Sequence, residues 1–286
     1  MWCQKDITSQ LNALGVRQGD SLLVISSLRA VGETVCGASG VLSSLLEAVG
    51  PNGNLLFPAF TLSNVLPVTE TGEVFCSEDE RLASALMTPF EPESTPVDTN
   101  LIGILPEIAR KHPDAYRSSH PLFSFTALGE DAHFFVRATP HHYPFGSESP
   151  LARLFQKDGS VILLGTDYSA NIALHLAEIW AETPYTRRSL LYRTADKRTC
   201  EMMGVPGCRA GFGRLEPLMN QSRLQRIGTV GSAKCRLFSM RMAISLATTY
   251  LGGEPSGLLC RNPECSRCTT ARKLCGSQDS SPTDTQ

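Results

Sequence analysis

The sequence predicts an α/β fold with a mixed, largely parallel sheet that is flanked by helices. Apolar runs of strand length, such as residues 21–28 (SLLVISSL) and 54–60 (NLLFPAF), alternate with longer amphipathic stretches. These runs are apolar at nearly every position, which is typical of strands that are buried on both faces of a sheet. The chain has 286 residues, of which 42% are hydrophobic, so it can bury a large core without disulfides.

The first third of the chain follows a β-loop-α-β order after an initial helix. We expect that helix at 8–16, a buried strand at 21–28, a second helix at 40–49 and the next strand at 54–60. The loop at 29–40 is rich in small residues and follows the first strand, at the sheet edge where parallel α/β proteins bind ligands. Its glycine spacing matches neither a dinucleotide fingerprint nor a P-loop, so a flexible crossover is the alternative interpretation.

The middle of the chain begins with a long stretch that lacks regular periodicity. Residues 61–100 are rich in Pro, Thr and Glu, and we expect an excursion from the core that shapes a pocket. Regular elements then resume. We expect helices at 102–115, 130–139, 149–159 and 171–180, and strands at 123–129 and 160–165.

The helix expected at 171–180 (NIALHLAEIW) carries a histidine at the edge of its apolar face. Ile172, Leu176 and Ile179 recur at helical spacing, and His175 lies at the border of the stripe that they form. Glu178 follows one turn later and can reach the imidazole. Two interpretations are open: a partly buried histidine held by local hydrogen bonds, or a general base that a carboxylate orients at the edge of a parallel sheet.

Seven segments occur in the order found in the aminoglycoside 3-N-acetyltransferase family, which the chain resembles over about residues 5–250. They are LLVISSLRAVG, AVGPNGNLLFPAFT, PFEPESTP, RSSHPLFSFTALG, FGSESPLARL, VILLGTDYSANIALHLAE and IGTVGSAKCRLFSM. The resemblance implies the α/β fold of that family, which differs from the common acetyltransferase fold. It also implies acetyl-CoA as the cosubstrate and transfer of the acetyl group to an amine.

The resemblance assigns roles to residues of the catalytic and CoA sites. The family's catalytic histidine lies in an LHxAE motif, so His175 is the expected general base, and Glu178 of the same motif is a candidate catalytic carboxylate. The family's CoA-contacting segment, in which backbone N–H groups and hydroxyls can bind phosphate or amide groups, matches Ser26, Ser27 and Leu28.

Substrate-binding candidates come from one further motif and from charge. In RSSHPLFSF, His120 is expected to hydrogen-bond the substrate or CoA, with a loop histidine bonded to backbone as the alternative, and Ser124 is a second candidate. An aminoglycoside is a polycation, so its pocket should be acidic. We take Asp98 as the acidic candidate from the excursion, which contains Glu73, Glu78, Asp79, Glu80, Glu91, Glu93 and Asp98.

Three departures from the family pattern bear on the site. Many relatives have a histidine where this chain has Ile25, and a small or polar residue where it has Leu122 and Phe123, which should make the pocket wall more apolar. The family's usual carboxylate partner of the catalytic histidine comes well after it in the sequence. In this chain Glu201 and Glu216 are the candidates there.

Charge and cysteine usage limit the function classes. The net charge is −2, without a basic block or stripe, so we expect a small-molecule amine as partner and neither nucleic acid nor a membrane surface. No signal-peptide pattern and no apolar run of about 20 residues occurs, which predicts a cytoplasmic protein. Most of the ten cysteines are scattered, and we expect them to be reduced.

We expect an acetyltransferase domain at 1–258 and a tail at 259–286, which contains the last four cysteines. The polar end of this tail is expected to be disordered. Four thiols could bind Zn²⁺ tetrahedrally, and here they are Cys260, Cys265, Cys268 and Cys275. The last of these lacks C-x2-C spacing, and the resemblance implies a tail without an essential metal. No metal is therefore favoured.

The predicted function is transfer of an acetyl group from acetyl-CoA to an amine, with the 3-amino group of an aminoglycoside as acceptor and antibiotic resistance as the outcome. One alternative is a biosynthetic N-acyltransferase that modifies a secondary-metabolite or siderophore amine. Another is a catalytically silent CoA-binding protein. A hydrolase that uses Ser26 or Ser27 is disfavoured because the chain lacks a G-x-S-x-G elbow. The resemblance also suggests a homodimer.

Overall fold

The computed structural model describes residues 1–62, 66–67, 89–187, 189–193, 199–204 and 207–276. Within these ranges, seven strands form the main sheet in the order β4-β5-β2-β1-β6-β10-β9. The central strand β1 (Ser21–Ser26) pairs in parallel with β2 (Asn54–Pro58) and β6 (Ser160–Leu164). The outer strands pair antiparallel: β5 (Phe125–Gly129) and β4 (Tyr116–Arg117) beyond β2, and β10 (Ala233–Ser239) and β9 (Gln225–Val230) beyond β6. The mixed α/β class is confirmed, but the described sheet is not largely parallel: two of its six strand pairings are parallel, both at the centre, and the other four are antiparallel.

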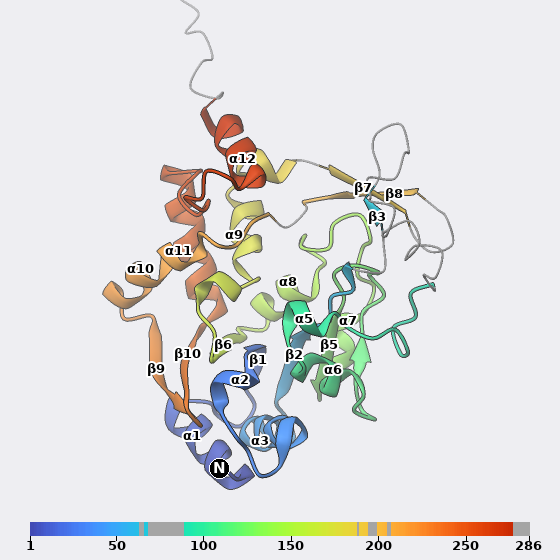
Figure 1. The fold of residues 1–286 in the computed structure, drawn as a ribbon, viewed down its shortest axis with the longest axis vertical. Coiled ribbons are helices and arrows are strands. Elements are labelled where there is room, and N and C mark those ends of the chain that lie inside the picture. Colours follow the sequence, from blue (N-terminus) through green and yellow to red (C-terminus); the bar gives the residue numbers. More distant parts are fainter. Residues whose placement is uncertain (63–65, 68–88, 188, 194–198, 205–206, 277–286) are drawn as a thin grey trace, which may run out of the picture.

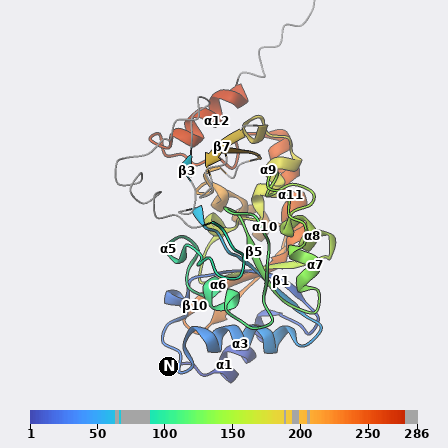
Figure 2. The same ribbon diagram turned by 90° about the vertical axis from the view of Figure 1, so that its right-hand side faces the viewer.

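Helices cover both faces of this sheet (Figures 1 and 2), which explains why its central strands are apolar at consecutive positions. In β1, Leu22 and Val24 belong to one hydrophobic cluster, whereas Leu23 and Ile25 belong to the other. The helices of the first face are α1 (Gln4–Leu14), α2 (Leu28–Val31), α3 (Gly37–Val49) and α6 (Leu105–Arg110). Those of the second face are α7 (Ala132–Val136), α8 (Pro150–Gln156), α9 (Leu174–Trp180), α10 (Leu215–Gln221) and α11 (Met240–Gly253).

Several helix boundaries differ from the sequence-based expectation. The helix expected at 102–115 is shorter: only α6 lies within that span, and the short helix α5 (Thr99–Ile102) precedes it. The two are separated at Gly103, which has φ +82°, a left-handed conformation that ends a helix. Part of the loop expected at 29–40 is helical, as α2 and the start of α3. Ser149 caps α8 as its position before Pro150 indicated: its Oγ accepts the backbone N–H of Ala152 at 3.1 Å.

A smaller sheet and the C-terminal helix lie at one end of the molecule. The sheet has the order β3 (Leu66–Pro67), β7 (Ser189–Arg193), β8 (Thr199–Met203). Helix α12 (Ser266–Gly276) contacts the 3-10 helix η3 (Pro184–Arg187), and in both views it lies at the end opposite α1 and α3. The disorder expected at the polar end of the tail concerns residues 277–286, which lie outside the described residues. No helix within the described ranges is long and apolar enough to cross a membrane.

Candidate active site

His175 and Glu178 form a hydrogen-bonded pair in the interior. Both lie on α9, three residues apart, and their exposed fractions are 3% and 2%. The distance from His175 Nδ1 to Glu178 Oε2 is 2.7 Å. Because an ionised carboxylate only accepts hydrogen bonds, Nδ1 carries the proton and the lone pair of the neutral imidazole is on Nε2. Within the described part of the chain, Nδ1 makes the only side-chain hydrogen bond of this ring, which leaves Nε2 as the basic atom.

The second oxygen of Glu178 is held by a residue that the sequence did not indicate. Tyr185, on η3, donates its hydroxyl proton to Glu178 Oε1 at 3.1 Å. Burial and the adjacent carboxylate raise the pKa of the Tyr185 phenol above its usual range, so the hydroxyl stays protonated and donates. The result is a chain of hydrogen bonds from Tyr185 through Glu178 to His175, which fixes the orientation of the imidazole.

Aromatic rings surround the imidazole. Phe145 and Phe212, the latter on the 3-10 helix η4 (Phe212–Arg214), meet it edge-to-face at centroid distances of 5.7 and 5.0 Å. Phe123 packs on Phe145 at 5.3 Å, and Leu122 is buried in the same hydrophobic cluster. The apolar residues expected in the pocket wall therefore belong to the core beside His175, and neither lines the pocket described next.

A pocket of about 520 Å³ opens at the carboxyl ends of β1 and β6. This is the edge at which ligands bind in α/β sheets. Among the described residues, those that line the pocket include the predicted CoA-contacting segment, two arginines and no carboxylate. Its lining residues are Ile25, Ser26, Ser27, Leu28, Arg29, Pro58, Thr99, Asn100, Leu101, Ile102, Gly103, Ile104, Thr166, Ala170, Ile172 and Arg209.

Arg209 is the second functional candidate that the sequence did not indicate. It is half-buried in the pocket wall, and burial lowers the pKa of its guanidinium. It has no ion pair with a carboxylate among the described residues, so a bound anion would compensate its charge. The pocket wall includes the segment that leads into α9: Ala170 and Ile172 line the pocket, and His175 follows three residues after Ile172.

The predicted substrate-side residues occupy different environments. His120 is fully buried: its Nδ1 accepts the backbone N–H groups of Leu122 and Phe123 at 3.1 and 3.0 Å, and its Nε2 donates to the His141 carbonyl at 3.1 Å. Burial, followed by the charge of His141, lowers the pKa of His120 to about 3, so it is neutral. The hydroxyl of Ser124, also buried, accepts from Arg117 Nε at 3.0 Å and donates to the Ala59 carbonyl.

The acidic candidates are also separated by the structure. Asp98 is half-buried and directly precedes Thr99, at the start of the pocket-lining helix α5. Glu91 and Glu93 are exposed. The other candidates named from the excursion, Glu73, Glu78, Asp79 and Glu80, lie outside the described residues.

The two carboxylates expected from the later part of the sequence do not partner His175. Glu216 binds Arg236 Nε at 2.6 Å, and Glu201 is exposed on β8. The carboxylate in contact with the imidazole is Glu178, from the same helix turn.

The cysteine set expected in the tail is also corrected. Cys260, Cys265 and Cys268 lie together as predicted, but the fourth member of the group is Cys208, and Cys275 is not part of it. Cys208 is more than fifty positions away in the sequence, so no local spacing could indicate it.

A family model described as aminoglycoside 3-N-acetyltransferase matches residues 23–252, which is most of the chain and includes the pocket and the histidine pair. The chain belongs to the aminoglycoside 3-N-acetyltransferase family. A curated relative, aminoglycoside N(3)-acetyltransferase IV from Salmonella sp., is 31% identical over 256 residues, which are 89% of this chain and 89% of the relative.

Solved structures of this family share the fold over most of the chain. The apoenzyme of aminoglycoside acetyltransferase AAC(3)-IVa superposes with a TM-score of 0.79 at 30% identity, over 96% of this chain and 98% of that one. The same enzyme has been solved as a mutant in complex with a gentamicin, with a TM-score of 0.77 at 30% identity over 96% and 97% of the two chains. The binary complex of AAC-IIIb with CoASH gives a TM-score of 0.74 at 27% identity over 88% and 96%. As a member of the family, the chain is an N-acetyltransferase by class.

Proposed function

We propose that this aminoglycoside 3-N-acetyltransferase family member transfers the acetyl group of acetyl-CoA to the 3-amino group of an aminoglycoside, with His175 as the general base. The observation that carries the proposal is the buried His175–Glu178 pair, whose Nδ1–Oε2 distance is 2.7 Å. His175 follows three residues after Ile172, which lines a pocket whose described lining residues include arginines and no carboxylate.

The pocket is the proposed site of the acyl donor. CoA carries a pyrophosphate and a further phosphate, and an anionic ligand fits a pocket whose charged lining residues are Arg29 and Arg209. Backbone N–H groups and hydroxyls of Ser26, Ser27 and Leu28 are available in the same wall for amide or phosphate oxygens. The CoASH complex of the related AAC-IIIb supports CoA as the ligand.

His175 is proposed to remove a proton from the acceptor. The ammonium group of the acceptor first loses one proton to solvent. As the neutral amine attacks the thioester carbonyl carbon, the Nε2 lone pair of His175 takes a second proton from the nitrogen, which keeps one proton in the amide. Glu178 stabilises the resulting imidazolium through Nδ1–H. When the C–S bond breaks, the imidazolium returns its proton to the CoA thiolate, so that the amide and the free thiol leave a neutral imidazole.

The acceptor is proposed from the relatives and from charge. The gentamicin complex of the related AAC(3)-IVa supports an aminoglycoside, and Asp98 beside α5 is the proposed carboxylate for one of its ammonium groups. A direct contact of substrate with His120 or Ser124 would require these residues to exchange the hydrogen bonds that they make within the protein. We therefore rank Asp98 first for substitution.

The test is thiol release from acetyl-CoA with a panel of aminoglycosides and simple amines. We expect the wild type to acetylate an aminoglycoside and His175→Ala to lose about 10² to 10⁴ in rate while it still binds CoA. His133→Ala, a change of the same type at an exposed position on α7, is the matched control. NMR of the product then tells whether the 3-amino group is the one that is modified.

Other outcomes would favour the alternatives. Turnover of simple amines without turnover of any aminoglycoside would indicate a biosynthetic N-acyltransferase. Binding of CoA without turnover of any acceptor would indicate a silent CoA-binding protein. Full activity of His175→Ala would contradict the general-base role.

A further inference from the structure

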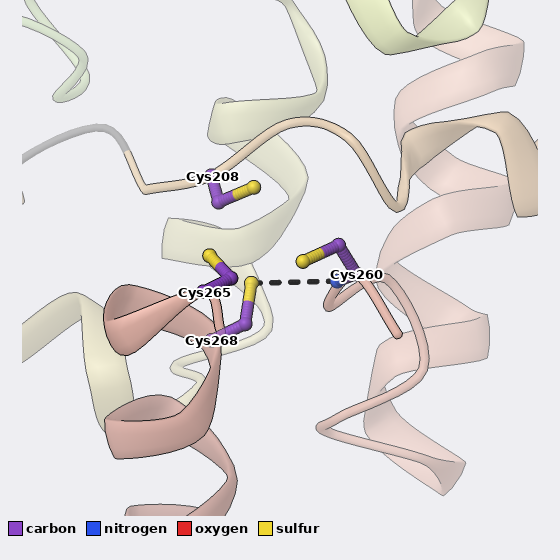
Figure 3. A group of neighbouring side chains, drawn as sticks. All are labelled: Cys208, Cys260, Cys265 and Cys268. Carbon is purple, nitrogen blue, oxygen red and sulfur yellow. Dashed lines mark hydrogen bonds between the residues drawn. The ribbon is translucent and has the colours of Figure 1, made fainter. Parts of the chain in front are cut away.

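Four cysteine side chains from three separate parts of the chain meet at one point. The sulfur atoms of Cys208, Cys260, Cys265 and Cys268 all lie within 4.8 Å of one another (Figure 3). Cys208 precedes η4, Cys260 follows α11, Cys265 directly precedes α12, and Cys268 lies in the first turn of α12. In a tetrahedral zinc–thiolate centre the Zn–S distance of about 2.3 Å separates the sulfurs by about 3.8 Å. Small side-chain rotations therefore convert the observed cluster into a tetrahedral site.

The surroundings of the cluster suit a charged metal–thiolate centre. The backbone N–H of Cys260 donates to Cys268 Sγ at 3.3 Å, a bond that stabilises a thiolate ligand. Arg272 donates to the Cys260 carbonyl at 2.6 Å. The segments 207–211 and 260–272 together carry four arginines and one carboxylate, and this excess of positive charge offsets the net −2 of four thiolates around Zn²⁺.

We propose that these four cysteines bind a structural Zn²⁺ ion. All four coordination positions are filled by protein thiolates, so the ion has no open position for a substrate and its role is to hold the chain together. Four sulfur ligands suit zinc or iron, and we assign zinc because it needs no redox partner and binds at a closed site of this kind.

The site would stabilise the region from which the candidate active site is built. Cys260 and Cys268 belong to a small hydrophobic cluster against which Tyr185 packs, and Tyr185 is the residue that donates to Glu178. Arg209, adjacent to Cys208, lines the pocket. The metal would therefore hold in place the segments that carry Tyr185 and Arg209. This effect on the active site rests on the proposed function, whereas the assignment of the metal site is independent of it.

The first experiment measures the zinc content of the purified full-length chain under reducing conditions. We expect about one zinc per chain in the wild type and a loss of most of it in Cys208→Ser and Cys265→Ser, because three thiolates hold the ion more weakly. Cys275→Ser is the matched control, since this cysteine lies on α12 outside the cluster and should leave the zinc content unchanged.

Cobalt substitution of the wild type provides a test that does not depend on the folding of a variant. We expect Co²⁺ to give the intense visible bands of a tetrahedral ion and the near-ultraviolet charge-transfer band of thiolate ligands, and Zn²⁺ to abolish both. His175→Ala should bind zinc as the wild type does, so a failure of the proposed acetyl transfer would leave this result intact.

Several outcomes would overturn the proposal. A reduced wild type that takes up neither Zn²⁺ nor Co²⁺ would show that the cluster is a set of buried thiols. Iron in place of zinc, or disulfides between these cysteines detected by mass spectrometry, would assign the cluster another chemistry. Loss of zinc in Cys275→Ser together with its retention in Cys208→Ser would restore the ligand set that the tail sequence suggests.

Discussion

Replacing Glu178 with Gln tests the assignment of the carboxylate partner most directly. The change keeps the size of the side chain and removes its negative charge. In the wild type, Oε2 lies 2.7 Å from His175 Nδ1, and Oε1 accepts from Tyr185. A glutamine can satisfy both neighbours if its amide oxygen faces the imidazole and its NH₂ group donates to the tyrosine oxygen, so the geometry can survive the change.

The expected effect follows from the charge that develops during catalysis. Two unit charges 2.7 Å apart attract by about 6 kcal/mol at an effective dielectric constant of about 20. Because the imidazolium charge is shared by two nitrogens and the carboxylate charge by two oxygens, we take about half, roughly 3 kcal/mol, as the stabilisation that is lost. This corresponds to a decrease of about 10²-fold in kcat/KM.

The assay is amine-dependent thiol release from acetyl-CoA, with thermal unfolding recorded in parallel to verify that the variant is folded. Glu201→Gln, which removes an exposed carboxylate, is the control and should retain wild-type activity. Tyr185→Phe should fall between the two, at about a tenfold loss, because it removes one hydrogen bond to a charged group. If Glu178→Gln stays within about threefold of the wild type, Glu178 does not stabilise the imidazolium and the reasoning is refuted.

Three further predictions concern the residues around this pair. Burial holds the pKa of His120 at about 3 in the folded state, below the value of about 6.5 in the unfolded chain. The contribution of His120 to the free energy of unfolding is therefore complete above pH 6.5 and is lost as the pH falls toward 3, with a decrease of about 2 kcal/mol between pH 7 and pH 5. Urea titrations at these two pH values should show a smaller decrease for His120→Gln than for the wild type. An equal decrease would contradict the burial argument. Arg209→Gln should raise the KM for acetyl-CoA about tenfold and leave the KM for the acceptor unchanged, because the proposed contact of its guanidinium with a CoA phosphate is lost. A change in the KM for the acceptor alone would show that acetyl-CoA binds elsewhere. Ser149→Ala should lower the free energy of unfolding by about 1 kcal/mol in a urea titration, because the N-cap bond to Ala152 is lost, and Ser149→Asn should recover most of it.

Much of the fold could be predicted because its signals are local. The central strands are apolar on both faces, and the position of His175 at the edge of a helical stripe follows from the spacing of Ile172, Leu176 and Ile179. Helix boundaries were less well predicted. The split between α5 and α6 depends on the left-handed backbone at Gly103, which a helical pattern of side chains does not reveal.

The candidate site was predicted only in part, because a sequence pattern indicates contacts within one helix or strand and not contacts between distant segments. Residues three apart on one helix, such as His175 and Glu178, are neighbours whatever the rest of the fold, so this contact could be predicted. The sequence also gave Glu201 and Glu216 as candidate carboxylate partners of His175. Ser26, Ser27 and Leu28 likewise line the pocket, as their position at the end of the first strand predicted. By contrast, no local pattern connects Tyr185 to Glu178, or Arg209 to the first strand.

The sequence by itself determined the α/β class, the family resemblance, the pocket-lining segment at the end of β1 and the histidine on α9. The tertiary structure decided which side chains from distant segments meet: Tyr185 with Glu178, Arg209 with the pocket, and Cys208 with the cysteines of the tail. The physical reason is that periodicity and spacing report the contacts within one helix or strand. Contacts between segments depend on the path of the whole chain, so Cys208 could replace Cys275 without any change in the local pattern of the tail.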